Sequence, residues 1–239
     1  MPRRFLRQLH GISATLLLAI IPLALGAATT ATAPADSLAA LAAHLAAMKN
    51  VKTLQADFTC EKRMAMLETP LVSSGKVWIA KPGSVRFATD KPYVSEIILH
   101  DGKVLTKSQH ENQWTRTDAG ARPGLNAVMG QLAGWSTGEP GALAEMYDVT
   151  TATGEIPPRP DSLDEKSAVV NADFFVLKPK NEVLAKSIKR ILLAIDRQSH
   201  HLLHVEITTA QNDITRYWFH DVQLDAQLPA DTFSPAGAK

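Results

Sequence analysis

The histidines are the first residues of this chain that could do chemistry, because imidazole binds metals and transfers protons near neutral pH. His200, His201 and His204 lie close together, and His200 and His204 have the i, i+4 spacing of a helical metal-binding pair. The residues around them predict a turn followed by a strand, in which positions four apart lie about 13 Å from each other. No HExxH pattern accompanies them. We therefore expect no metal site.

Local motifs for covalent or phosphate chemistry are also missing. No G-x-S-x-G nucleophile turn occurs, and neither Ser74-Gly75 nor Gly134-Trp135-Ser136 supplies the second glycine. The G-x-x-x-x-G-K phosphate loop is absent as well. A hydrolase built from dispersed Asp, Glu and His stays open as the less favoured alternative. We expect no catalytic residue, no cofactor and no enzyme activity.

The single cysteine, Cys60, excludes an internal disulfide. Residues 54–61 alternate between apolar and polar side chains, which predicts a half-buried strand with Cys60 on its apolar side. We interpret Cys60 as a small buried hydrophobe rather than a reactive thiol.

The first 27 residues have the order of a secretory signal peptide. Three arginines precede an apolar run at residues 12–25, and small residues follow it. The run is short for a membrane span, which needs roughly 20 apolar residues. No cysteine at its end could receive a lipid. We expect cleavage near residue 27 and an exported single domain at residues 28–239, with an uncleaved anchor as the alternative.

Charge and length limit the class of the exported part. Removing the three leader arginines leaves 22 basic residues against 24 acidic ones, a formal charge of −2. No basic stripe stands out, so nucleic acid is not an expected partner. Residues 154–166 contain three prolines and six charges, and they predict an exposed loop or extended connection, with a linker between two domains as the alternative.

The elements that must position any site are mainly strands. Apolar residues at helical spacing predict a helix from Asp36 to Met48. Turn residues separate the later strands, and Asp101-Gly102 is a strong hairpin signal. Seven to ten antiparallel strands are expected in one curved sheet, with short helices on a face. The predicted strands cover residues 54–61, 74–80, 84–89, 93–100, 103–109, 172–177, 187–196, 202–208 and 214–222.

Two short helices are expected between these groups of strands. Leu125, Val128, Met129 and Leu132 predict a helix flanked by glycines, which could be a movable cover or an ordinary core helix. A second helix is predicted near residues 142–147. The tail at residues 228–233 predicts a short helix or turn that inserts Phe233 into the body.

Several short motifs together resemble the LolA family of periplasmic outer-membrane lipoprotein carriers. They are LQADFTC at residues 54–60, SGKVWIAKPG at 74–83, Val85-Arg86-Phe87, Pro92, Asp101-Gly102-Lys103 and FFVLKPK at 174–180, followed by 191–196 and 228–233. The resemblance covers nearly the whole exported chain. It implies an incomplete antiparallel β-barrel, a half-open sheet whose concave face is closed by short helices.

The resemblance also implies a function. A protein of this family shelters lipoprotein acyl chains, or a related lipid, in a hydrophobic cavity. It receives them from an inner-membrane transporter and passes them to an outer-membrane acceptor. We accordingly expect a periplasmic, monomeric, non-catalytic carrier. The alternative is a lipoprotein- or lipid-sensing regulatory module of the same fold.

Candidate contacts follow from the resemblance and the apolar pattern. The expected acyl-binding residues are Leu54, Phe58, Trp78, Phe87, Ile97, Leu99, Met129 and Leu132. The family commonly has an arginine before the strand-turn proline, where it bonds the lid; here that residue is Lys81. Lysine lacks the planar fork of arginine, so we expect a more loosely held lid. Together with Cys60 in place of the family's glutamine, Lys81 indicates a divergent paralogue.

Overall fold

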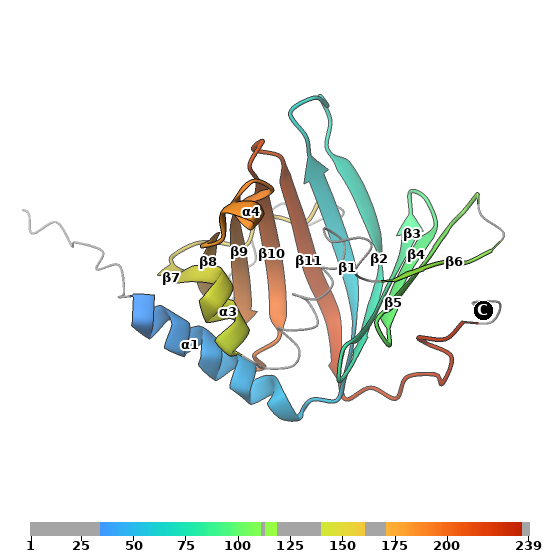
Figure 1. The fold of residues 1–239 in the computed structure, drawn as a ribbon, viewed down its shortest axis with the longest axis horizontal. Helices are drawn as coiled ribbons and strands as arrows, with labels where there is room; N and C mark the ends of the chain where they lie inside the picture. The colour runs from blue at the N-terminus through green and yellow to red at the C-terminus, as the bar shows by residue number, and fades with distance from the viewer. Residues whose placement is uncertain (1–33, 111–112, 119–139, 161–170, 236–239) are drawn as a thin grey trace, which may run out of the picture. The chain divides into compact units, whose positions relative to one another are not determined.

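The computed structural model describes residues 34–110, 113–118, 140–160 and 171–235, all within one compact unit, Ala31–Lys239. Eleven strands form a single sheet (Figure 1). The strands are β1 Thr53–Arg63, β2 Leu71–Ala80, β3 Ser84–Lys91, β4 Ser95–His100, β5 Lys103–Ser108, β6 Thr115–Asp118, β7 Tyr147–Ala152, β8 Ala172–Pro179, β9 Ile188–Asp196, β10 Leu202–Thr209 and β11 Ile214–Leu224. The helices are α1 Pro34–Ala47, the 3₁₀ turn η1 Met48–Asn50, α3 Pro140–Met146 and α4 Glu182–Ala185.

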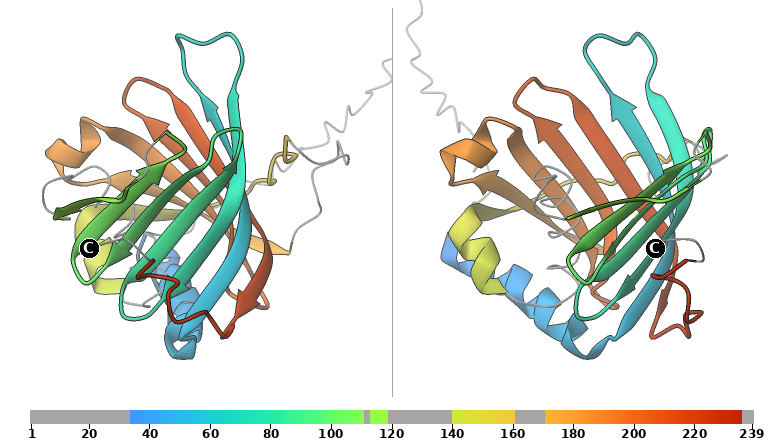
Figure 2. Two further views of the ribbon diagram at one scale, coloured as in Figure 1. Left: turned by 90° about the vertical axis from the view of Figure 1, so that its right-hand side faces the viewer. Right: turned by 45° about the vertical axis from the view of Figure 1, so that its right-hand side comes forward.

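The sheet is antiparallel throughout and open. Its order is β6-β5-β4-β3-β2-β1-β11-β10-β9-β8-β7, so β1 and β11 join the two halves of the chain. The sheet is curved and does not close (Figure 2). This confirms the expected incomplete barrel, with eleven strands instead of seven to ten.

Alternation along the strands gives the sheet two different faces. We call the side that carries Ala56 and Phe58 the inner face and the other side the outer face. Ala56 pairs with Val77 and Phe58 pairs with Phe219, so the apolar set continues across three strands. Cys60 follows on the same face and is buried, as predicted. The apolar residues of the inner face form two large clusters, one in each half of the sheet.

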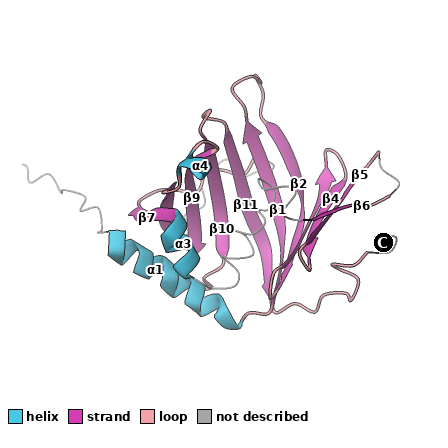
Figure 3. Cartoon of the chain, in the orientation of Figure 1, coloured by secondary structure: helices cyan, strands magenta, loops and turns pink. Residues whose placement is uncertain are grey.

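The helices are few and short beside the sheet (Figure 3). The predicted N-terminal helix is confirmed as α1, although it starts at Pro34, so Asp36 lies in its first turn. Its buried residues Leu41 and Leu45 belong to the same cluster as Phe175 and Ile195 of the sheet. The helix near residue 142 is confirmed as α3. The predicted helix at residues 125–132 lies outside the described residues.

The outer face of β8–β11 is covered by the connection after β7. Ile156 is buried against Phe174 and Trp218, and the Trp218 indole Nε1 donates to the Pro157 carbonyl at 2.8 Å. The expectation that residues 154–166 form an exposed loop is therefore wrong at Ile156, because the outer face here is apolar and needs a cover. Within the described ranges, no helix is long and apolar enough to cross a membrane.

Candidate functional site

A small apolar cavity lies between the inner face and the helices α1 and η1, which we call together the cover helix. It encloses about 70 Å³. Thirteen of its fifteen lining residues are apolar, and the other two are histidines of the β9–β10 turn. The lining residues are Leu41, Leu45, Met48, Leu54, Ala56, Val77, Ile79, Phe87, Leu193, Ile195, His200, His201, Leu202, Phe219 and Val222.

This volume is far below that of an ordinary ligand pocket, which is about 300–1,000 Å³. The cavity as it stands accommodates no acyl chain of full length. Because the cover helix forms one wall, the hollow can grow only if this helix or the sheet moves. The contacts of the cover helix therefore decide how the site opens.

Lys81 holds the C-terminal end of the cover helix. Its Nζ donates to the carbonyls of Met48 and Lys49, at 2.7 and 3.0 Å. The last carbonyls of a helix lack partners within the helix, and a cation there also meets the negative end of the helix dipole. Burial lowers the pKa of the Lys81 ammonium, while the nearby Asp225 acts to raise it.

A histidine pair holds the middle of the cover helix. The His44 ring on α1 is buried, and its Nδ1 lies 2.9 Å from Nδ1 of His200 in the β9–β10 turn. The His44 Nε2 lies 3.1 Å from the Asp173 carboxylate, which also accepts from Arg197 at 2.8 Å. Partial burial acts to raise the Asp173 pKa, but the hydrogen bonds from Arg197 and His44 outweigh it and lower that pKa.

A third contact fixes the N-terminal end of α1. The Thr151 backbone N–H of β7 donates to the Ser37 hydroxyl at 3.0 Å. Polar contacts thus clamp the cover helix at its start, middle and end. Between them, Leu41 and Leu45 supply the apolar contact with the sheet.

The sequence-predicted contact residues divide into three groups. Leu54 and Phe87 line the cavity. Phe58, Ile97 and Leu99 lie on the same inner face, in the cluster of the β1–β4 half. Met129 and Leu132 fall outside the described residues. Whether any of these side chains contacts a lipid remains a proposal.

Trp78 lies on the outer face and does not line the cavity. Its Nε1 donates to the Gln55 side chain at 2.9 Å, and the Arg86 guanidinium lies 5.2 Å from its ring centroid. Arg86 in turn pairs with Glu96 and donates to the Thr232 carbonyl. We therefore exclude Trp78 from the contacts expected inside the hollow.

Reasoning from the sequence missed three residues that hold the cover helix: Ser37, His44 and Asp173. Their partners lie more than 100 positions away along the chain, so no local spacing indicates these contacts. The histidine cluster was noticed, but its role was not. His200 lies in a turn and contacts α1, whereas His204 lies on β10 and faces the opposite side of the sheet.

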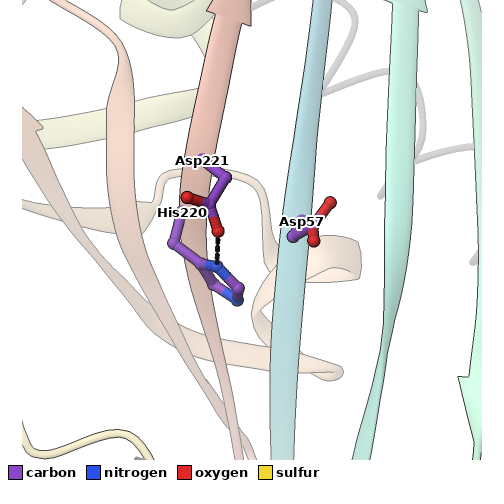
Figure 4. Close-up of side chains that lie close together, drawn as sticks. All are labelled: Asp57, His220 and Asp221. Carbon is purple, nitrogen blue, oxygen red and sulfur yellow. Dashed lines mark hydrogen bonds and ion pairs between the residues drawn. The ribbon is translucent and has the colours of Figure 1, made fainter.

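A second group of polar side chains lies on the outer face at β1 and β11. Ligand atoms of Asp57, His220 and Asp221 lie within 4.8 Å of one another (Figure 4). The Lys76 ammonium already pairs with Asp57, and His220 Nδ1 bonds Asp221 at 2.7 Å. These contacts account for the group as a surface ion-pair cluster, and we assign it no metal.

Comparison with known proteins finds one family model that matches part of the chain. Residues 49–153 match the family model of the outer membrane lipoprotein carrier protein LolA. Comparison with curated proteins finds no matching sequence.

Solved structures of low identity match this chain with TM-scores below 0.5. A chain of the Pseudomonas aeruginosa MucA/MucB complex is 18% identical with a TM-score of 0.49, and the match covers 83% of this chain and 60% of that one. The lipoprotein LppX of Mycobacterium tuberculosis is 12% identical with a TM-score of 0.46, covering 81% and 99%. A LolA superfamily protein of Nitrosomonas europaea is 10% identical with a TM-score of 0.40, covering 83% and 97%. This chain thus spans only 60% of the first of these relatives.

The matched segment contains β1 to β7 and the motifs LQADFTC and SGKVWIAKPG, which form the inner face beside the cavity and carry Lys81. The family match and these motifs support a divergent LolA-like protein over this part of the chain.

Proposed function

We propose that this protein is a periplasmic carrier that shelters acyl chains of a lipoprotein, or of a related lipid, in the hollow beneath the cover helix. The apolar cavity carries the proposal, since thirteen apolar side chains from the helix and both halves of the sheet converge on it. Exposing one acyl chain of about 15 methylenes to water costs on the order of 12 kcal/mol, at roughly 0.8 kcal/mol per methylene. A non-catalytic carrier removes this cost by burying the acyl chain in its apolar cavity.

Export and transfer belong to the same proposal. The leader at residues 1–27 directs the chain to the periplasm and is cleaved, leaving residues 28–239 as one domain. An inner-membrane transporter donates the lipid and an outer-membrane acceptor receives it. The protein acts as a monomer.

The clamp on the cover helix gives the carrier a way to release its ligand. In the empty state Lys81, His44 and Ser37 hold the helix over the apolar surface. An entering acyl chain displaces the helix and gains the apolar wall, but it loses these polar contacts. This cost keeps the affinity below that of an open pocket of the same area, so transfer onward stays possible.

Two measurements test the carrier. The exported chain is purified from the periplasm and its bound lipids are identified by mass spectrometry, and binding of a fluorescent fatty acid is measured by titration. A co-purified acyl lipid together with saturable fatty-acid binding supports the proposal. Failure to bind any acyl compound refutes it.

A tether tests the movement of the cover helix. Ser37 and Thr151 are in direct contact, so Ser37→Cys with Thr151→Cys should form a disulfide that fixes α1 to β7. Cys60→Ala removes the competing thiol. Fatty-acid uptake should fall at least tenfold when the disulfide is oxidised and return on reduction, while each single-cysteine variant serves as the control. Uptake that is unchanged with the tether formed shows that the helix does not move.

A further inference from the structure

The exposed large apolar side chains are not scattered over the described residues. All eight of them lie at one end of the sheet, which we call the apolar rim. They are Met66, Leu67, Leu71, Val72, Tyr93, Val94, Met146 and Val183. Single exposed hydrophobes need no explanation, but their concentration at one site marks an interaction surface.

The topology brings these residues to the same end. Strands alternate in direction, so the β1–β2, β3–β4 and β8–β9 connections all emerge at one end. They carry, in turn, Met66 with Leu67, Tyr93 with Val94, and Val183. Met146 joins them because its carbonyl accepts from the Lys180 backbone N–H. The β1–β2 hairpin projects furthest from the sheet (Figures 1 and 2).

The opposite end has a different character. Its connections contain Lys81-Pro82-Gly83, Asp101-Gly102 and residues 197–201, which are polar or form tight turns. No large apolar side chain is exposed there among the residues that the structure describes. The two ends of the sheet therefore present different surfaces to their surroundings.

The arrangement of the apolar rim fits a lipid bilayer better than a folded protein. The side chains stand on separate turns, which polar residues divide along the chain. Met66 is 82% exposed, Val183 74% and Tyr93 67%, so each projects by itself. A fluid bilayer accepts such isolated projections, whereas a protein interface needs a packed, contiguous apolar centre.

Charge on the three turns supports the same occupant. Lys62, Lys91 and Lys186 flank the apolar tips and are exposed. Lysine at a membrane surface extends its ammonium to the headgroups while its stem stays in the apolar layer. Each turn also has an acidic residue: Glu68, Asp90 or Glu182. The net charge is thus small, and apolar insertion must dominate the binding.

We propose that the apolar rim docks the protein onto the surface of a lipid bilayer, with Met66 and Leu67 entering the boundary between headgroups and acyl chains. Tyr93, Val94 and Val183 support the contact from the neighbouring turns. The proposal rests on the carrier function in one respect. A carrier that takes acyl chains from one membrane and delivers them to another has a reason to contact both membranes. The contact itself requires no ligand in the cavity.

The test is co-sedimentation of the exported chain, residues 28–239, with phosphatidylcholine vesicles. The three buried clusters are built from residues of the compact unit Ala31–Lys239, so this chain keeps its own core. Met66→Ser with Leu67→Ser should lower the vesicle partition coefficient at least tenfold. Tyr93→Ser with Val94→Ser should lower it several-fold. Glu68→Gln, a polar change on the same hairpin, is the matched control and should leave it unchanged.

Three results would overturn the proposal. These are no binding of the parent chain to vesicles, equal binding of the parent and the Met66/Leu67 variant, and binding only to phosphatidylglycerol vesicles that salt abolishes. Because all of these residues are exposed, thermal unfolding should be unchanged in each variant.

Fatty-acid titration of the same variants separates this proposal from the carrier function. None of the substituted residues lines the cavity, so the Met66/Leu67 variant should bind fatty acid like the parent. If the parent chain binds vesicles but no fatty acid, the carrier function is refuted and membrane docking by the apolar rim is supported. If it binds fatty acid but no vesicles, the carrier function is supported and membrane docking is refuted.

Discussion

His204 predicts how the stability of this protein depends on pH. Its ring is fully buried on the outer face of β10 beside Trp218, with 5.1 Å between the ring centroids. Neither ring nitrogen has a hydrogen-bond partner among the described residues. Burial lowers the pKa of His204 to about 4, although the Glu206 carboxylate acts to raise it.

The sign and size of the effect follow from this pKa. Above about pH 6.5, His204 is neutral in both the folded and the unfolded chain. Between pH 6.5 and 4, His204 is protonated in the unfolded chain but stays neutral in the folded chain. The free energy of unfolding therefore falls as the pH falls. Acidification from pH 7 to pH 5 should cost about 2 kcal/mol through this residue, and complete acidification about 3 kcal/mol.

Urea unfolding at pH 7 and pH 5 measures the effect. His204→Leu keeps a side chain of similar volume against Trp218 and removes the titrating group. The variant should lose about 2 kcal/mol less than the parent between the two pH values. His110→Gln, at an exposed histidine in the β5–β6 turn, is the control and should behave like the parent. An equal loss in the parent and the His204 variant would refute the reasoning.

Three further predictions follow from single contacts. Lys81→Met removes both hydrogen bonds to the end of the cover helix and should cost about 1–3 kcal/mol in urea unfolding, while Lys81→Arg should restore most of it; a variant as stable as the parent would show that the clamp is not needed. Gly75→Ala should destabilise the fold by roughly 3 kcal/mol or more, because a Cβ there would lie 1.9 Å from the Ala88 carbonyl oxygen; an unchanged melting temperature would contradict this. Hydrogen bonds from Arg63 lower the pKa of the buried Glu61 despite its desolvation. The Glu61 carboxylate therefore stabilises the fold above about pH 4.5, and this stabilisation is lost on further acidification. Glu61→Gln should flatten the stability profile below pH 4.5, and an unchanged slope there would exclude this carboxylate as the cause.

Most of the strands could be predicted because their signals are local. The alternation at residues 54–60 gives both the strand and the buried side of Cys60. Asp101 and Gly102 both have positive φ, at 48° and 68°, which is the backbone that the Asp-Gly signal predicts. Strands β6 and β7 were missed because TRTD and YDVTTA offer too few apolar residues to show a period.

The site was only partly predictable, because its faces depend on pairing between distant strands. Val77, Trp78 and Ile79 are all apolar, so the sequence alone does not say which of them points inward. Pairing of Gln55 with Trp78 places the indole on the outer face and leaves Val77 and Ile79 inside. The contact of His44 with His200, which lies 156 positions away, exists only in the folded chain.

The free edges of the sheet have a mechanical consequence. In a closed barrel the bore is fixed by strand number and stagger, and widening it means breaking a column of backbone bonds. Among the residues that the structure describes, β6 and β7 end the sheet without joining each other. The two halves of the sheet can therefore rotate apart about the central strands β1 and β11, while the backbone hydrogen bonds between neighbouring strands stay intact. The interior can thus widen around a ligand at the cost of changed twist and of the polar contacts that hold the cover helix to both halves.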